Sequence, residues 1–225
     1  MTMNKIVLNT WEEVRRWVDA TNLHIPPSYL EQVNNRRYPV DAFSIGQMAS
    51  KAWLLHHLHH TKSDKDEVVV ALFGCWVGAL VPFLHNSFEI ERIYGFDLDT
   101  QTIELAERFN QQYVENSWKF KGVVADVSIL STDKLEFETG GELITVTPNW
   151  VVNTSCEHMD SSWFETASSD QLIIMQSNDS PDFEGHINTC NDLEHFKAKY
   201  PMSNIQFAGE LKTPAYTRFM QIGYK

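Results

Sequence analysis

The densest group of reactive side chains lies at residues 153–160, directly after a predicted buried strand. The stretch NTSCEHMD places an imidazole, His158, beside a carboxylate, Glu157, which is four residues after the amide of Asn153. An imidazole with an ordinary pKa near 6.5 can act as a general base at neutral pH, and a neighbouring carboxylate can orient it or bind substrate. We therefore predict His158 and Glu157 as catalytic residues, with Ser155 contacting the substrate. The alternative is a strand-to-helix turn whose polar side chains bond their own backbone.

A second candidate is the segment ALFGCWVGAL, residues 71–80. Gly74 and Gly78 bracket a turn between an apolar run and a predicted helix, and glycine lets the backbone bend sharply and approach a ligand closely. Trp76 stands where such a loop would usually have its smallest residue. The two glycines are equally compatible with an ordinary buried turn.

Aspartates follow the next two predicted strands. Asp97 comes 23 residues after Gly74, close to the roughly 20-residue offset at which an acidic side chain meets a ribose hydroxyl pair. Asp126, in VVADVS, stands where a carboxylate can accept from the exocyclic amine of an adenine, with Val127 packing on the ring. Asp99 is assigned instead to capping the following helix.

The polar segment QSNDSPDFEGHINTCNDLEHF follows the fifth predicted strand. Long polar loops in compact domains are usually functional or mobile. We therefore predict Ser177, Asn178 and His186 as substrate-binding residues. The alternative is a surface excursion that ends at the next helix cap.

Metal binding is the minority interpretation of two clusters. Two cysteines and two histidines should converge at one sheet edge, but their spacings, Cys-x-His and His-x3-Cys, match no strong zinc pattern; these are Cys156, His158, His186 and Cys190. In HHLHH, His56 and His60 are four residues apart, yet polar residues in a last helical turn suit the carbonyl end of the helix. The sequence therefore favours no metal.

Elements that alternate along the chain must position these residues. Short apolar runs predict strands at 68–73, 92–96, 120–124, 150–153 and 171–176, and helical patterns fall at 78–85, 101–113, 161–166 and 192–200. Continuous apolar runs such as VVVALF and LIIM indicate parallel strands buried on both faces. NIQFAGEL and AYTRFMQIGYK predict a closing antiparallel hairpin. The fold class is α/β, with a doubly wound, mostly parallel sheet.

The N-terminal part is predicted to be helical. TWEEVRRWVDA begins with a capping box in which Thr10 and Glu13 satisfy each other's backbone. HIPPSYLEQVNN, residues 24–35, predicts a short helix, and a longer helix begins near Ser44. No Pro/Gly/Ser-rich linker divides the chain. We expect one compact unit, with residues 1–62 as a helical cap and 63–225 as the Rossmann-like domain.

Composition narrows the class of protein. The chain has 225 residues, a formal net charge of −12 and three cysteines. Nucleic-acid binders normally carry a basic face, and no Lys/Arg cluster here exceeds two residues, so we expect no nucleic-acid partner. No apolar run approaches the roughly 20 residues of a membrane span, and the N-terminus lacks signal-peptide features. The expectation is a cytoplasmic protein with reduced thiols and no membrane partner; the oligomeric state is not indicated.

Taken together, VVVALFGCWVGAL, IYGFDLD, VVADVS and the closing GEL…YTRFMQIGYK hairpin resemble a class I S-adenosylmethionine-dependent methyltransferase over residues 68–225. The resemblance implies a seven-stranded sheet whose last strand is antiparallel, with S-adenosylmethionine as cofactor. It implies that residues 74–78 approach the methionine part, Asp97 the ribose, and Asp126 with Val127 the adenine. The full set of expected cofactor contacts is Phe73, Gly74, Cys75, Gly78, Asp97, Leu98, Asp126, Val127, Asn153 and Thr154. Leu72 and Trp76 depart from the family pattern, which often has an acidic residue and a glycine at these positions.

The resemblance implies methyl transfer, with the NTSCEH loop facing the transferred group. This loop lacks the Asn/Asp-Pro-Pro-aromatic motif of adenine-type nucleotide methyltransferases, so we expect a small-molecule O or N acceptor. Two alternatives stay open: an enzyme that cyclises or cleaves the cofactor itself, and a non-catalytic nucleoside-binding domain. A dehydrogenase is disfavoured because Trp76 would obstruct a pyrophosphate, and a P-loop is excluded because no Gly-Lys-Ser/Thr follows.

Overall fold

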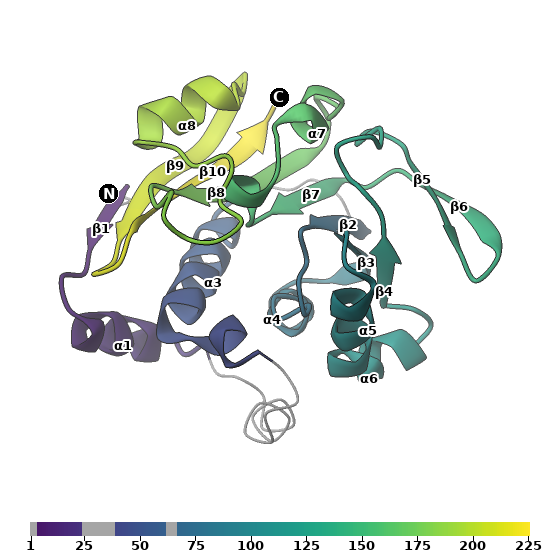
Figure 1. Ribbon diagram of the computed structural model, residues 1–225, viewed down its shortest axis with the longest axis horizontal. Helices are drawn as coiled ribbons and strands as arrows, with labels where there is room; N and C mark the ends of the chain where they lie inside the picture. The colour runs from purple at the N-terminus through teal and green to yellow at the C-terminus, as the bar shows by residue number, and fades with distance from the viewer. Residues whose placement is uncertain (1–3, 24–38, 62–66) are drawn as a thin grey trace.

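The computed structural model describes residues 4–23, 39–61 and 67–225, and eight of its strands form one sheet in the order β1-β9-β10-β8-β7-β2-β3-β4 (Figure 1). These strands are β1 (Lys5–Val7), β2 (Val68–Phe73), β3 (Ile90–Asp97), β4 (Phe120–Val124), β7 (Trp150–Asn153), β8 (Leu172–Asn178), β9 (Asn204–Lys212) and β10 (Thr217–Tyr224). Strand β10 is antiparallel to both β8 and β9, whereas the other neighbouring pairs are parallel. The predicted doubly wound, mostly parallel sheet with an antiparallel C-terminal hairpin is therefore confirmed.

The sheet has one strand more than predicted. Strand β1 pairs in parallel with β9, Ile6 lying opposite Leu211, and so extends the sheet at the β9 edge. Three residues are too few for a period-2 pattern to stand out from their surroundings, which explains why the sequence did not indicate this strand.

Helices cover both faces of the sheet. They are α1 (Trp11–Ala20), η1 (Val40–Phe43), α3 (Ile45–Leu58), α4 (Val81–Ser87), α5 (Thr100–Phe109), α6 (Gln111–Glu115), η2 (Cys156–His158), α7 (Ser162–Glu165) and α8 (Leu193–Lys199). The predicted helix at 101–113 is two helices, divided at Asn110, whose buried side-chain amide donates to the carbonyls of Gly78 and Ala106. The helix after the first glycine loop begins at Val81, because residues 74–80 form the turn itself.

Strand β2 shows why the sheet is buried on both sides. Val70 and Leu72 belong to the core shared with α1, α3, α4 and α5, whereas Ala71 and Phe73 belong to the core shared with α7 and α8. Successive side chains of a strand point to opposite faces, so a strand covered on both faces must be apolar at every position. This arrangement leaves the carboxyl ends of the strands as the place for polar chemistry.

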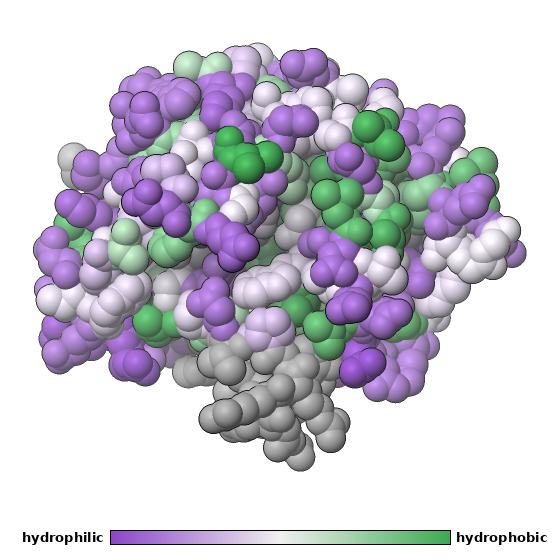
Figure 2. All heavy atoms as spheres, in the orientation of Figure 1, coloured by the Kyte–Doolittle hydropathy of each residue, from purple (hydrophilic) through white to green (hydrophobic). Residues whose placement is uncertain are grey.

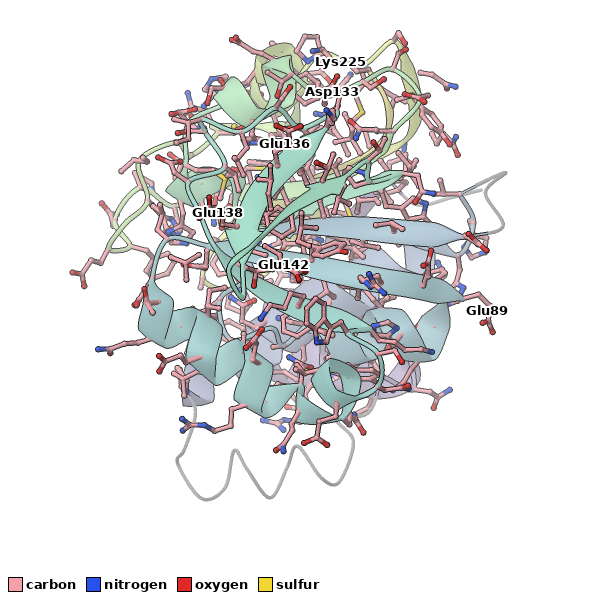
Figure 3. All side chains as sticks on the ribbon, turned by 90° about the vertical axis from the view of Figure 1, so that its right-hand side faces the viewer. Glu89, Asp133, Glu136, Glu138, Glu142 and Lys225 are labelled. Atoms are coloured by element: carbon pink, nitrogen blue, oxygen red, sulfur yellow. The ribbon has the colours of Figure 1, made fainter. Side chains whose placement is uncertain are left out.

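A second, two-stranded sheet was not predicted. Strands β5 (Leu135–Thr139) and β6 (Glu142–Val146) form an antiparallel hairpin around Gly140 and Gly141, both with positive φ. Leu135 and Phe137 pack into the core, while alternate glutamates point outward; Figure 3 labels Glu136, Glu138 and Glu142 on this hairpin. The Gly-Gly pair between alternating apolar residues is the signal in the sequence from which this hairpin could have been predicted.

The N-terminal elements lie against the same sheet. The side chain of Thr10 accepts from the Glu13 N–H while Glu13 reaches back to the Thr10 N–H, so the predicted capping box is confirmed. Helix α3 packs on the sheet through Ser50, whose hydroxyl bonds the buried Gln176 of β8 at 2.5 Å. The short helix predicted at 24–35 lies outside the described residues. Within the described ranges, no helix is long and apolar enough to cross a membrane.

Candidate active site

A cavity of about 800 Å³ opens at the carboxyl ends of the central strands. Its walls come from three groups of residues: the strand-end loops, the N-terminal helices, and the turn before β10 with the start of that strand. The lining includes Trp11, Asp41, Lys51, Gly74, Cys75, Trp76, Asp97, Leu98, Asp126, Val127, Thr154, Ser155, Glu157, His158, Met159, Asn178, Phe183, His186, Tyr216 and Arg218. Figure 2 shows apolar residues over the segment that joins β4 to β5, where Ile129 is 81% exposed.

The centre of the site is the point where strand order reverses, between β2 and β7. Gly74 follows β2 with φ +58°, and a Cβ built on it would lie 2.9 Å from the Cβ of Ser155, which follows β7. The Ser155 hydroxyl lies 3.3 Å from the Gly74 carbonyl. Gly74 is therefore required both by its backbone conformation and by the close approach of the second loop. This is the location where open α/β sheets bind ligands.

Asp97 holds the glycine loop in place. Its Oδ2 accepts from the Trp76 N–H at 3.0 Å, and its Oδ1 accepts from the Asp99 N–H at 3.2 Å. Trp76 adopts φ +47°, a left-handed conformation that a bulky residue rarely takes. Asp99 caps α5, as predicted, by accepting from the Gln101 N–H. A carboxylate has about four acceptor positions, so Asp97 retains capacity for a ligand.

At one end of the cavity, Asp126 and Val127 follow β4. Asp126 Oδ1 accepts from both the backbone N–H and the hydroxyl of Ser128, at 2.9 and 2.6 Å. Leu98, also in the cavity wall, is 69% exposed. The end therefore combines an oriented carboxylate with apolar surface, which suits a flat, amine-bearing ring.

The opposite end contains a buried ionic network centred on Glu157. Glu157 Oε1 accepts from Asn178 Nδ2 at 2.7 Å and lies 3.6 Å from Arg218 Nη2. Glu157 Oε2 is buried and has no partner among the described residues. Arg218 also donates to the Thr154 carbonyl at 3.2 Å. One oxygen of Glu157 is thus fixed and the other is available to a ligand.

The loop after β8 brings a second imidazole to His158. The His158 and His186 rings pack edge to face with centroids 4.6 Å apart. His158 Nδ1 lies 3.2 Å from the Gly185 carbonyl, and His186 Nδ1 lies 2.6 Å from the Ser180 carbonyl. A carbonyl only accepts, so each Nδ1 carries the proton and each Nε2 keeps its lone pair. Burial lowers the pKa of His158 below its usual value, and His186 contributes in the same direction against the opposing effect of Glu157.

The N-terminal elements supply residues that the sequence analysis did not identify. Trp11, Asp41 and Lys51 line the cavity, and Tyr216 joins them from the turn before β10. Burial lowers the pKa of Lys51 to about 7; the Arg218 charge adds to this effect, and Asp41 opposes it. These residues are far apart in sequence and meet only through packing of α1 and α3 on the sheet, so no local motif marks them.

Some predicted residues stand behind the cavity wall. Four predicted residues do not line the cavity, in contrast to the other predicted cofactor and substrate residues: Phe73, Gly78, Asn153 and Ser177. Phe73 is buried against Phe96 and Trp163 because its side chain points to the opposite face of β2. These four positions therefore support the wall from behind.

The packing of Gly78 and Asn153 accounts for their positions. A Cβ at Gly78 would lie 2.5 Å from Asn110 Nδ2, so this glycine serves helix packing. Asn153 Oδ1 accepts from the Ser155 N–H at 3.0 Å and so shapes the turn after β7.

The cysteines do not join the histidines. Cys156 and Cys190 are fully buried in the apolar core shared with α7 and α8. Burial raises the pKa of both thiols, most strongly for Cys156, which disfavours the thiolate form that binds metals. A Cys2His2 site is therefore not formed by these four residues.

Neither a protein-family model nor a curated protein sequence matches the chain. Solved structures do. The N-methyltransferase NodS from Bradyrhizobium japonicum aligns with a TM-score of 0.56 at 10% identity, covering 82% of this chain and 98% of its own. A geranyl diphosphate methyltransferase in complex with S-adenosylmethionine aligns with a TM-score of 0.56 at 12% identity, over 92% and 94%. PH1948 from Pyrococcus horikoshii, an RNA methyltransferase candidate, aligns at 0.53 and 15% identity, over 94% and 96%.

These likenesses extend over nearly the whole of each chain, and the strand order with an antiparallel β10 agrees with what the resemblance implied. Identities of 10–15% are informative about fold alone. The protein has the class I methyltransferase fold.

Proposed function

We propose that the cavity binds S-adenosylmethionine and that the protein transfers the methyl group to an oxygen or nitrogen atom of a small-molecule acceptor. The observation that carries the proposal is the order of groups along one cavity. Asp126, Asp97 and Gly74 lie at the carboxyl ends of β4, β3 and β2, which are neighbours in that order, as adenine, ribose and methionine parts would need them. Glu157 and His158 come after β7, the next strand in the sheet.

The residues present fit such a cofactor. A volume of about 800 Å³ lies within the roughly 300–1,000 Å³ of small-molecule sites and leaves room for an acceptor. Gly74 has no side chain, and a Cβ at this position would occupy the space between its loop and Ser155. When bound, the cofactor supplies a methyl group on a positively charged sulfur; the carbon–sulfur bond breaks as the acceptor lone pair bonds the carbon, and S-adenosylhomocysteine is released.

The protein's own part is to align the acceptor and take its proton. His158 is neutral at pH 7 because its pKa is lowered, and its Nε2 lone pair is the one left free by the Nδ1–carbonyl contact. Glu157, fixed through Oε1 by Asn178 and Arg218, offers Oε2 to a donor group of the acceptor. Aligning a reactive pair in this way is a large part of what such an enzyme must provide.

The acceptor class rests on charge. The outward face of the β5–β6 hairpin carries glutamates (Figure 3), and the chain has a net charge of −12, so the field over this side opposes a phosphate backbone. Among the described residues, the cavity wall holds only two Lys/Arg residues, Lys51 and Arg218, against five carboxylates, so it too disfavours a phosphate chain; the carboxylates are Asp41, Asp97, Asp126, Glu157 and Glu184. We also propose that the described part of residues 1–62 contributes a cap over the site, because Trp11, Asp41 and Lys51 form part of its wall.

The test is an assay for S-adenosylhomocysteine with a panel of hydroxyl- and amine-bearing small molecules, and with tRNA as a separate arm. The proposal predicts turnover with at least one small molecule and none with tRNA. Methylthioadenosine as product would indicate cleavage of the cofactor instead. Tight cofactor binding with no product from any arm would indicate a non-catalytic nucleoside-binding domain.

A further inference from the structure

We propose that Glu157, His158 and His186 form a binding site for a divalent transition-metal ion at the acceptor end of the cavity. These three residues each offer a ligand atom, and the three atoms lie within 4.8 Å of one another. They line the same cavity and come from two loops, η2 and the segment after β8. The proposed methyl transfer gives His186 no part in the chemical step, and a buried oxygen of Glu157 has no partner in the described structure.

Both histidines have a tautomer and a ring orientation that suit a metal ligand. Histidines that bind metals usually donate their second ring N–H to a carbonyl or a carboxylate, which fixes the tautomer and the ring orientation. His158 Nδ1 meets the Gly185 carbonyl and His186 Nδ1 meets the Ser180 carbonyl, so both Nε2 lone pairs are left for a ligand. Gly185 has φ +79°, and a Cβ there would lie 3.3 Å from the His158 ring. The loop therefore needs glycine at this position to reach His158.

The carboxylate of Glu157 is likewise held by contacts to one oxygen, with the other oxygen left unpaired. Asn178 and Arg218 both contact Glu157 Oε1, and Oε2 has no hydrogen-bond partner among the described residues. Glu157 is only 2% exposed, so this unpaired acceptor is buried. A buried acceptor without a partner is costly, and a cation would satisfy it. The Ile187 and Asn188 N–H groups donate to the Glu157 carbonyl, at 2.9 and 3.0 Å, and so tie the His186 loop to the Glu157 turn.

The distances require a small contraction. Three ligand atoms that lie within 4.8 Å of one another are at most about 2.8 Å from a common centre. Nitrogen and oxygen ligands of zinc lie at about 2.0–2.2 Å, so each atom would move inward by at most roughly 0.7 Å. Rotation of two imidazoles and a carboxylate about their side-chain torsions can supply such a shift without moving the backbone.

Ligand chemistry selects the ion. Two imidazoles and a carboxylate suit Zn²⁺ and related first-row ions, and three protein ligands leave coordination positions open to the cavity. Mg²⁺ and Ca²⁺ prefer oxygen ligands and are disfavoured here. A role for the metal ion in catalysis rests on the proposed methyl transfer. In that reaction, the hydroxyl or amine of the acceptor would bind at the open coordination position, and the metal ion would lower the pKa of that group. His158 would then serve as a ligand instead of as the base.

The test is a calorimetric titration of the full chain with Zn²⁺, without S-adenosylmethionine or acceptor, and a parallel titration with Co²⁺ followed by visible absorption. Failure of methyl transfer thus has no bearing on the result. We expect one Zn²⁺ site in the wild-type protein. His158→Gln and His186→Gln should each lower the Zn²⁺ affinity by more than roughly 10–100-fold, which is the loss usually seen when a residue that hydrogen-bonds to a metal ligand is removed. The His56→Ala/His60→Ala variant controls for the other histidine pair, whose ring centroids are 5.0 Å apart, and should retain the site.

Unchanged Zn²⁺ affinity in the His158 and His186 variants would overturn the proposal, as would loss of binding only in the His56/His60 variant. Thermal unfolding is a second measurement, in which the change of Tm on adding Zn²⁺ is compared within each protein. Zn²⁺ should raise the Tm of the wild-type protein and of the helix-end variant, but not that of His186→Gln. An equal rise in all three proteins would also contradict the site.

Discussion

Arg218 Nη2 lies 3.6 Å from Glu157 Oε1, and the two side chains are only 5% and 3% exposed. Arg218 comes from β10, the last strand in the sequence, whereas Glu157 lies in the short helix η2 after β7. The pair therefore connects the C-terminal hairpin to the end of the cavity lined by Glu157 and His158. Its geometry also explains why only one Glu157 oxygen is engaged.

Removing one member of this pair should be costly. We expect Arg218→Met to lower the free energy of unfolding by about 3–5 kcal/mol, because Glu157 would be left as an uncompensated buried charge. The measurement is urea unfolding at pH 7. Lys5→Met is the matched control: Lys5 pairs with Glu210 at 2.6 Å but is 64% exposed, so its loss should cost less than about 1 kcal/mol. Equal costs for the two variants would contradict the assigned burial of the Arg218 pair.

Gly74 and Gly140 allow two effects to be separated. Both have φ near +60°, but a Cβ at Gly140 has nothing within 4 Å, whereas one at Gly74 meets Ser155 at 2.9 Å. Gly140→Ala should cost only the backbone strain, about 1–2 kcal/mol. Gly74→Ala should cost more and should also weaken S-adenosylmethionine binding, as measured by chemical unfolding and calorimetry. The assignment fails if the two variants cost the same and bind equally.

Lys51 should make stability depend on pH in a defined direction. Its pKa is lowered to about 7 in the folded state, from 10.5. The unfolded state therefore binds more protons between about pH 7 and 10.5, and stability rises with pH across this window. Below about pH 7 both states are protonated, and the cost of burying the charge is present in full.

Lys51→Met should consequently be more stable than wild type at pH 6.5, and its advantage should shrink towards pH 9.5. The measurement is urea unfolding of both proteins at each pH. Lys134→Met, at an exposed residue paired with Glu136, should show no such shrinking advantage. A pH-independent difference between wild type and Lys51→Met would show that Lys51 is not buried as a charge.

His158→Ala should lower turnover far more than cofactor affinity, because the imidazole lies at the acceptor end and Asp97 and Asp126 remain in place. In the wild type, kcat should fall on the acid side with a midpoint below pH 6.5, since burial lowers the pKa of His158 and the neutral form is the active one. His195→Ala, on α8, is the control and should behave as wild type. A rate near wild type for His158→Ala would remove this residue from the mechanism.

The central strands could be predicted from sequence because burial on both faces produces a continuous run of apolar residues. Val68–Phe73 and Trp150–Asn153 were located to the residue, since strands covered on both faces are almost continuously apolar. The edge strand Phe120–Val124 was also located to the residue, although Lys121 interrupts its apolar run. Residues just after these strands could be predicted for the same reason: topology alone brings the carboxyl ends of parallel strands together. Asp97 and Asp126 line the cavity accordingly.

What could not be predicted depends on contacts between distant segments. Lys51 reaches the cavity only because α3 packs on β9 and β10, and no spacing in the sequence encodes that packing. His186 was predicted to bind substrate, but its pairing with His158 depends on a loop whose close approach needs Gly185. The orphaned oxygen of Glu157 likewise results from where Arg218 and Asn178 stand. Such features are properties of the tertiary structure.

The central claim is that this cavity binds S-adenosylmethionine through Asp97. It is tested most directly by calorimetric titration of S-adenosylmethionine into the wild-type, Asp97→Asn and Asp97→Ala proteins. We predict a single site in the wild type, with Asp97→Ala weakening binding by about 1–3 kcal/mol through lost charge-assisted hydrogen bonds. Asp97→Asn should lose less, because it keeps one side-chain oxygen as acceptor. Absence of binding to the wild type, or the same affinity in all three proteins, would contradict the account.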